Sequence, residues 1–168
     1  MTSATPGQTI GPFFHHALAY PGDSELVPFG AAGSVLLHGY VYDGAGAPVP
    51  DAMIEIRQAD ATGAVPETEG SLRRRGSAFT GWGRSCTDRT GRYWFSTVEP
   101  GGPTPFFAVA VFARGLLDRL FTRIYLPGTD GAVDGLVARR EDDGGLRFDI
   151  HLQGENETVF FSFPRHRS

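Results

Sequence analysis

The stretch PTPFFAVAVFARG, residues 103–115, has no charged side chain before Arg114 and is about as long as a β-strand. Successive side chains of a strand point to opposite faces of its sheet. The expected core face carries Phe107, Val109 and Val111, and the second face carries Phe106, Ala108, Ala110 and Phe112. A strand with one face in water normally alternates apolar and polar residues. This strand is instead apolar on both faces, with small residues in the middle of the second face and a single cation at its end.

Other segments also have the pattern of short strands bounded by turn residues. They are residues 34–43, 52–60, 91–101, 119–128, 145–154 and 157–163. In 145–154 the alternation is clean, because apolar residues occupy the even positions from Leu146 to Leu152. The chain also contains 23 glycines, 12 prolines and 13 phenylalanines among its 168 residues, which favours turns and strands. The sequence therefore predicts an all-β fold, an antiparallel β-sandwich.

Three parts of the chain do not have a strand pattern. Residues 1–33 lack a hydrophobic period but carry several aromatic residues, so we expect an extended N-terminal arm that packs against another surface. The segment 130–142 is expected to hold one short helix, capped by Asp130. The loop 61–83 is longer than most connections, which favours a functional or partner-facing role. The expected domain plan is an arm over 1–33 and a β-sandwich over 34–168.

Composition and charge exclude several classes of function. The net charge is −4 and there is no large basic block, which argues against nucleic-acid binding. The single cysteine, Cys86, excludes an internal disulfide and a cysteine-rich metal site. The sequence shows neither the pattern of a secretion signal nor an apolar run of the roughly 20 residues that span a bilayer. We therefore expect a soluble cytoplasmic protein.

The residue types alone do not assemble a complete active site. His38, Asp149 and His151 form a conceivable iron triad, although histidines on strands are more often ordinary outer-face residues. The basic stretch LRRRGS, residues 72–77, is more simply a solvated loop than an anion site. Cys86 has the character of a buried thiol. Neither a nucleophile elbow nor a phosphate-binding glycine loop is present in the sequence.

Five segments, taken in order, resemble the intradiol ring-cleavage dioxygenases. They are TPGQTIGPFF (5–14), GYVYDGAGAPVPDAMIEIRQADATG (39–63), GRSCTDRTGRYWFSTVEPG (83–101), VFARGLLDRLFTRIYLPG (111–128) and LRFDIHLQGENETVFFSF (146–163). Each motif alone is weak, since strands of the GRYWFSTVEPG kind also occur in transthyretin-like sandwiches. The five in order, nearly from end to end, are specific.

The resemblance implies non-haem iron chemistry, in which catalytic chains hold Fe(III) through two tyrosines and a His-x-His pair. The matching tyrosine positions fall in residues 61–80 and 101–105, and neither segment contains a tyrosine. Phe106 and Ala108 stand at the histidine positions. The unusual second face of the strand at 103–115 is then a metal-binding face rebuilt with carbon, and no metal ligand and no complete catalytic set is expected in this chain alone.

The resemblance further implies an iron-free alpha subunit in a hetero-oligomer of alpha–beta units. The homologous beta subunit binds Fe(III), and the arm over 1–33 packs on that partner. The complete site cleaves protocatechuate with O₂ to 3-carboxy-cis,cis-muconate, in the beta-ketoadipate pathway of aromatic degradation. By resemblance, this chain would contribute Thr9, Gly11, Pro12 and Arg114 to substrate binding in the beta-subunit site. The fork of guanidinium donors suits the substrate carboxylate.

The sequence departs from the family at several points, and other interpretations stay open. Arg57 stands where a tryptophan is usual, and the segments 101–106 and 20–34 are shorter than in typical alpha chains. The main alternative is a non-catalytic, transthyretin-like β-sandwich binding module. A free-standing iron enzyme built on the histidine triad is the other. For Arg114 the simpler role is an outer-face ion pair with Asp118.

Overall fold

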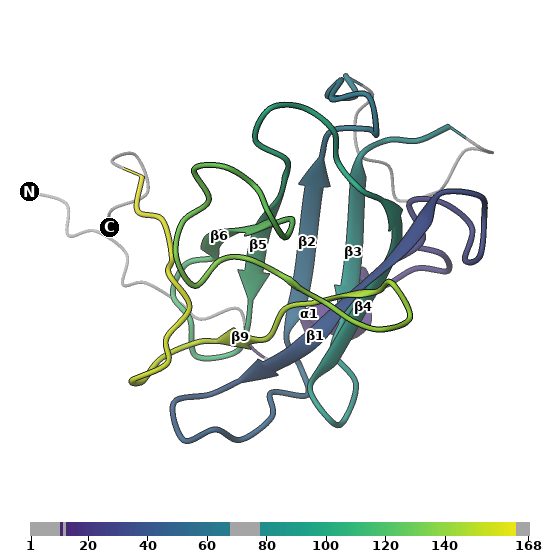
Figure 1. The fold of residues 1–168 in the computed structure, drawn as a ribbon. Coiled ribbons are helices and arrows are strands. Elements are labelled where there is room, and N and C mark those ends of the chain that lie inside the picture. The colour runs from purple at the N-terminus through teal and green to yellow at the C-terminus, as the bar shows by residue number, and fades with distance from the viewer. Residues whose placement is uncertain (1–10, 12, 68–77, 164–168) are drawn as a thin grey trace, which may run out of the picture.

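The computed structural model describes residues 11, 13–67 and 78–163, and two β-sheets pack face to face within them (Figure 1). The first sheet has the order β4-β1-β8-β7, with β9 also paired to β1, and the second has the order β3-β2-β5-β6. The strands are β1 Ser34–Tyr42, β2 Met53–Gln58, β3 Trp82–Cys86, β4 Arg92–Val98, β5 Phe106–Phe112, β6 Leu120–Tyr125, β7 Arg139–Arg140, β8 Leu146–Arg147 and β9 Ile150–His151. The predicted all-β sandwich is confirmed.

The hydrophobic core lies between the two sheets. Strand alternation places one face of β5 in it, because Phe107, Val109 and Val111 are buried while their neighbours on β5 are only half-buried. From the first sheet Tyr93 and Phe95 of β4 are fully buried. The predicted core face of the 103–115 segment is therefore correct, and the second face of β5 points away from the core.

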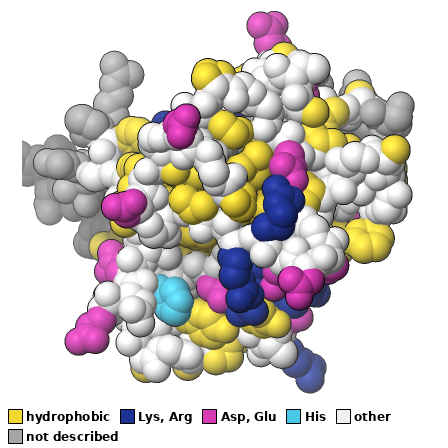
Figure 2. All heavy atoms as spheres, viewed as in Figure 1, with side chains coloured by type: hydrophobic (Ala, Val, Ile, Leu, Met, Phe, Trp, Pro, Cys, Tyr) yellow, Lys and Arg dark blue, Asp and Glu magenta, His cyan; other side chains and the backbone are white. Residues whose placement is uncertain are grey.

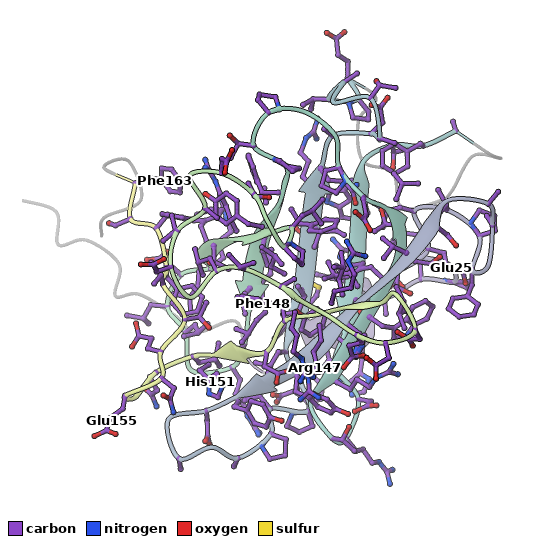
Figure 3. The ribbon with its side chains drawn as sticks, in the orientation of Figure 1. Glu25, Arg147, Phe148, His151, Glu155 and Phe163 are labelled. Carbon is purple, nitrogen blue, oxygen red and sulfur yellow. The ribbon has the colours of Figure 1, made fainter. Side chains whose placement is uncertain are left out.

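The first and last strands of the sandwich pair in parallel, which the sequence did not predict. β1 pairs with β8 and then, further along, with β9. Between them Phe148, labelled in Figure 3, lies against β1: its amide donates to the carbonyl of His38 at 2.9 Å, and its carbonyl accepts the Tyr93 hydroxyl at 2.6 Å. The same carbonyl lies directly over Gly39. This contact divides the predicted strand over 145–154 into two short pieces.

The helix expected over 130–142 is not formed. Gly131 and Gly135 have positive φ values of 73° and 78°, which interrupt any helical run. The segment instead lies beside β6, where the Tyr125 amide donates to the carbonyl of Leu136 at 2.8 Å and the Ala138 amide donates to the carbonyl of Tyr125 at 2.9 Å. Within the described ranges the one helix is α1, Phe14–Leu18, which lies inside the arm.

Two further segments differ from the sequence prediction. β3 was not predicted, because its residues 83–85 are glycine, arginine and serine and so show no apolar pattern. In the structure these three residues are nevertheless buried. The predicted strand over 157–163 is reduced to an isolated bridge between Phe161 and Phe121. Among the residues that the structure describes, no helix has the length and apolar character needed to cross a bilayer.

Candidate functional site

The outer face of the second sheet carries a row of residues aligned across four strands. Arg57 of β2 pairs in register with Trp82 of β3 on one side and with Ala108 of β5 on the other. Ala108 in turn pairs with Arg123 of β6. The small side chain of Ala108 is therefore flanked by an arginine on each neighbouring strand.

The side chains at this end of β5 do not fit a ferric ion. Phe106 and Ala108, at the positions that the resemblance gives to the histidine ligands, offer no donor atom. Arg123 places its guanidinium carbon 4.3 Å from the centre of the Phe106 ring, a cation–π contact, and the Tyr125 ring packs 5.8 Å from the same ring. Two guanidinium groups beside Ala108 would also repel a cation. Phe106, Ala108 and the arginines beside them would therefore not hold a metal cation.

A pocket of about 360 Å³ opens at this end of the sheet. Its lining is mostly apolar and rich in backbone from two turns, and it consists of Arg57, Gln58, Ala59, Gly63, Val65, residues 100–104, Phe106 and Ala108. A cavity thus lies against the second face of β5 at this end of the strand.

Arg114 lies at the opposite end of β5, two residues beyond the strand. Its Nε forms an ion pair with Asp51 Oδ2 at 3.0 Å, so the alternative partner Asp118 is not the one that the structure shows. The Asp51 side chain is 9% exposed and that of Arg114 is 60% exposed. Asp51 therefore anchors one edge of a guanidinium that is otherwise presented to solvent.

The described part of the arm reaches the same end of the sheet. Cys86 Sγ donates to the carbonyl of His15 in α1 at 3.1 Å, which ties α1 to the end of β3. Met53 pairs in register with both Cys86 and Phe112, so the ends of β3 and β5 lie on either side of the start of β2. Gly11, just before α1, is half-buried with a φ of 72°.

The other arm residues expected at the site, Thr9 and Pro12, lie outside the described residues, as does the basic stretch 72–77. Of the four predicted substrate-binding residues, the structure therefore places Gly11 and Arg114. It brings the helix that follows Gly11 and the strand that precedes Arg114 to one end of the second sheet.

The two ends of β5 are far apart. Ala108 and Arg114 are six residues apart in the sequence, and at about 3.3 Å per residue this separates them by roughly 20 Å. Arg114 cannot reach the pocket at Ala108 in its own chain. The cavity and the candidate carboxylate-binding arginine thus belong to two different sites.

The alternative iron triad is not assembled. His38 Nε2 pairs with Glu141 Oε2 at 2.8 Å, Asp149 pairs with Arg147 at 2.8 Å, and the His151 ring stacks on Tyr42. Figure 2 shows acidic and basic side chains interspersed on the face that carries these pairs. Within residues 11, 13–67 and 78–163, no three His, Cys, Asp or Glu side chains group as a metal site would require.

Cys86 provides a chemical probe of the contact between the arm and the sheet. Burial, reinforced by the Asp23 carboxylate, raises the pKa of its thiol from 9.0 to about 11. At pH 8 the reactive thiolate is therefore about 100-fold scarcer than in a free cysteine, and we expect alkylation by iodoacetamide to be slower by about that factor. Alkylation can be followed by mass spectrometry, with the urea-unfolded chain as the control. Equal rates in the folded and unfolded chain would show that α1 does not cover the thiol.

Three residues of these sites were not predicted as such. Arg57 was noticed only as a departure from the family pattern, and Arg123 carried no signal because its role depends on which residue it faces across the sheet. Asp51 precedes β2 in a turn-rich segment, where an acidic residue is unremarkable in sequence. Its contact with Arg114 joins residues that are 63 positions apart, which only the strand pairing reveals.

Comparison with known proteins assigns the family. A model of the Dioxygenase family matches residues 11–108. The chain is 36% identical to the protocatechuate 3,4-dioxygenase alpha chain of Burkholderia cepacia, over 94% of this chain and 96% of that one. It is 34% identical to the alpha chain of Pseudomonas putida, over 95% and 96% of the two chains. The beta chain of Burkholderia cepacia is 30% identical over 74% of this chain and 66% of its own length.

Solved structures agree in fold. The dioxygenase domain of a dioxygenase carbohydrate-binding protein fusion from Streptomyces sp. SirexAA-E superposes with a TM-score of 0.62 at 26% identity, covering 90% of this chain and 99% of that one. Catechol 1,2-dioxygenase from Acinetobacter sp. ADP1 superposes with a TM-score of 0.58 at 20% identity, covering 76% and 55%, and shows the same fold. With a matching family model and near full-length relatives above 30% identity, the chain belongs to the intradiol ring-cleavage dioxygenases.

Proposed function

We propose that this chain is the iron-free alpha subunit of a protocatechuate 3,4-dioxygenase and completes the active site of a homologous beta subunit. The similarity to two alpha chains, 36% and 34% identity over nearly their full lengths, supports the assignment. The beta subunit would hold the non-haem Fe(III), which in this family activates the bound catechol ring toward O₂. The ring then opens between its two hydroxyl-bearing carbons.

The observation that carries the proposal is the separation of the two ends of β5. Arg114 is mostly exposed and lies roughly 20 Å from the pocket of its own chain, so a ligand bound at Arg114 would not occupy that pocket, and the open guanidinium is free to face a site on a partner. The ion pair with Asp51 at 3.0 Å fixes the guanidinium and reduces the entropy that it loses on binding. A fixed guanidinium is suited to a carboxylate such as that of protocatechuate.

In this proposal the start of the arm lies on the partner. Phe13, two residues after Gly11, is 78% exposed, and Leu117, three residues beyond Arg114, is 63% exposed. Burying such side chains against a second chain removes apolar surface from water at roughly 25 cal/mol per Å². Thr9, Gly11 and Pro12 would then line the flat face of the substrate, where glycine and proline leave room for a close approach.

The test of the proposal uses three preparations: this chain alone, the beta homologue alone, and the two chains produced together. We expect a stable hetero-oligomer on size exclusion, full ring-cleaving activity only in that complex, and iron only in preparations that contain the beta subunit. The isolated chain should be colourless, because no tyrosine stands at a ligand position to form the coloured ferric–tyrosinate bond. Stoichiometric iron with a visible absorption band in the isolated chain would contradict the proposal. If the chain is a monomer that does not bind the beta homologue, the alternative of a non-catalytic binding module would be supported instead.

A further inference from the structure

We infer that the pocket at the Ala108 end of β5 binds a small aromatic carboxylate, at a site separate from the one that Arg114 would serve in the partner. The inference rests on the shape, rigidity and charge of the pocket, and it does not depend on the proposed function.

The pocket has the size and surface of a small-molecule site. Its volume of about 360 Å³ falls within the range of roughly 300–1,000 Å³ that is typical of such sites. Phe106 and Ala108 contribute apolar surface from β5, and Val65 and Pro103 add more from the surrounding turns. An aromatic ring bound in the pocket would therefore lose its contacts with water and gain contacts with apolar side chains on several sides.

The walls of the pocket are already formed. The turns around Gly63 and Gly101 are tied together, since both amides donate to the carbonyl of Asp60, at 3.0 Å and 2.8 Å. A Cβ atom on Gly101 would collide with the backbone of Ala61, so the two turns are in close contact. The Asp60 carboxylate accepts from the amides of Thr62 and Ala64 and braces the same turn. A wall held this way needs little ordering when a ligand binds.

The charge of the pocket selects an anion. Among its described lining residues Arg57 is the one charged side chain, and its Nη2 donates to the carbonyl of Pro66 at 3.0 Å, which holds the guanidinium at the rim. Arg123 lies across Ala108 in the same row and adds positive potential. The side-chain amide of Gln58 already donates hydrogen bonds to the carbonyls of Ala59 and Val98. An apolar cavity with a cationic rim fits a ring that bears a single carboxylate.

The test is ¹⁹F NMR of 4-fluorobenzoate with the full-length chain, without the beta homologue. We expect saturable broadening of the probe signal, and weaker binding of the neutral isostere 4-fluorobenzamide. Ala108→Phe fills the pocket and should abolish binding. Arg57→Gln should weaken it about ten-fold, the loss expected for one charge-assisted contact worth about 1.4 kcal/mol. Because the Arg57 side chain is exposed, we expect Arg57→Gln to fold normally. It therefore still tests the inference if Ala108→Phe fails to fold.

Two control variants separate this site from others. Arg139→Gln removes a cation that is 69% exposed on β7 of the other sheet, and it should leave the affinity unchanged. Arg114→Ala should also leave it unchanged, so failure of the proposed role of Arg114 and failure of this inference give different results. The inference is wrong if the probe does not bind, if the benzamide binds equally well, or if Arg57→Gln binds like the parent chain. In those cases the pocket receives an apolar side chain of a partner, or no ligand.

Discussion

Replacing Arg114 with alanine in the reconstituted complex is expected to lower kcat/KM for protocatechuate by about 10- to 100-fold, since a charge-assisted hydrogen bond contributes roughly 1.5–3 kcal/mol and each ~1.4 kcal/mol is tenfold. The loss should lie mainly in KM, because the carboxylate is remote from the bond that breaks and is bound equally in the ground and transition states. Turnover of catechol, which has no carboxylate, should change little. Steady-state kinetics with both substrates measures the ratio directly.

The ion pair with Asp51 supplies the matched control. Arg114→Ala also leaves a nearly buried carboxylate without its partner, which could disturb the subunit on its own account. Asp51→Asn breaks the same ion pair but keeps the arginine, so it should retain most of the preference for protocatechuate. Arg114→Lys should recover only part of the loss, since lysine lacks the fork. If Asp51→Asn and Arg114→Ala each lower kcat/KM equally for protocatechuate and for catechol, Arg114 supports the structure of the subunit and does not bind the substrate.

Gly39→Ala is expected to be the most destabilising small substitution in the first sheet. A Cβ atom on Gly39 would lie well inside van der Waals contact with the carbonyl of Phe148, which is backbone and cannot rotate away. Relief requires the C-terminal segment to lift from β1, with loss of the Tyr93 hydroxyl bond to the same carbonyl. We expect the free energy of unfolding to fall by about 3 kcal/mol, measured by urea denaturation.

Gly44→Ala is the control for this substitution. The three atoms nearest to its Cβ would all belong to the flexible side chain of Gln153, which can move aside. We therefore expect a change within about 0.5 kcal/mol, as for most surface substitutions. A Gly39→Ala chain as stable as Gly44→Ala would mean that Phe148 does not lie against β1 as the structure shows.

The parts of the fold that follow from local pattern were predictable from the sequence. β5 alternates strictly, so its buried face follows from the sequence alone, whereas in β2 both Met53 and Ile54 are buried although they point to opposite faces. β3 was missed because its burial depends on contacts from elsewhere. Arg84 is buried only because Glu55 of β2 pairs with it at 2.6 Å and the carbonyl of Leu18 accepts from it at 2.7 Å. Such a residue has no hydrophobic signal of its own.

The candidate sites divide in the same way. That Phe106 and Ala108 stand at the positions which the resemblance gives to metal ligands can be read from the sequence, because it concerns residue identity at fixed positions. The row that places Arg57 and Arg123 on either side of Ala108 was not visible, since it depends on the register of three strands. The anchoring of Arg114 by Asp51 likewise required the turn before β2 and the end of β5 to meet in space.

The parallel pairing of the first and last strands also constrains how the chain is made. Tyr40 and Asp149, which hydrogen-bond across this pairing, are 109 residues apart. During synthesis one edge of β1 stays open until residues 146–151 have left the ribosome, and an open strand edge invites pairing with other chains. Contacts this distant in sequence also form late, because the entropy of closing the loop opposes them. The sandwich of a nascent chain therefore closes only once β8 and β9 have been made, and until then the open edge of β1 is exposed to wrong pairing.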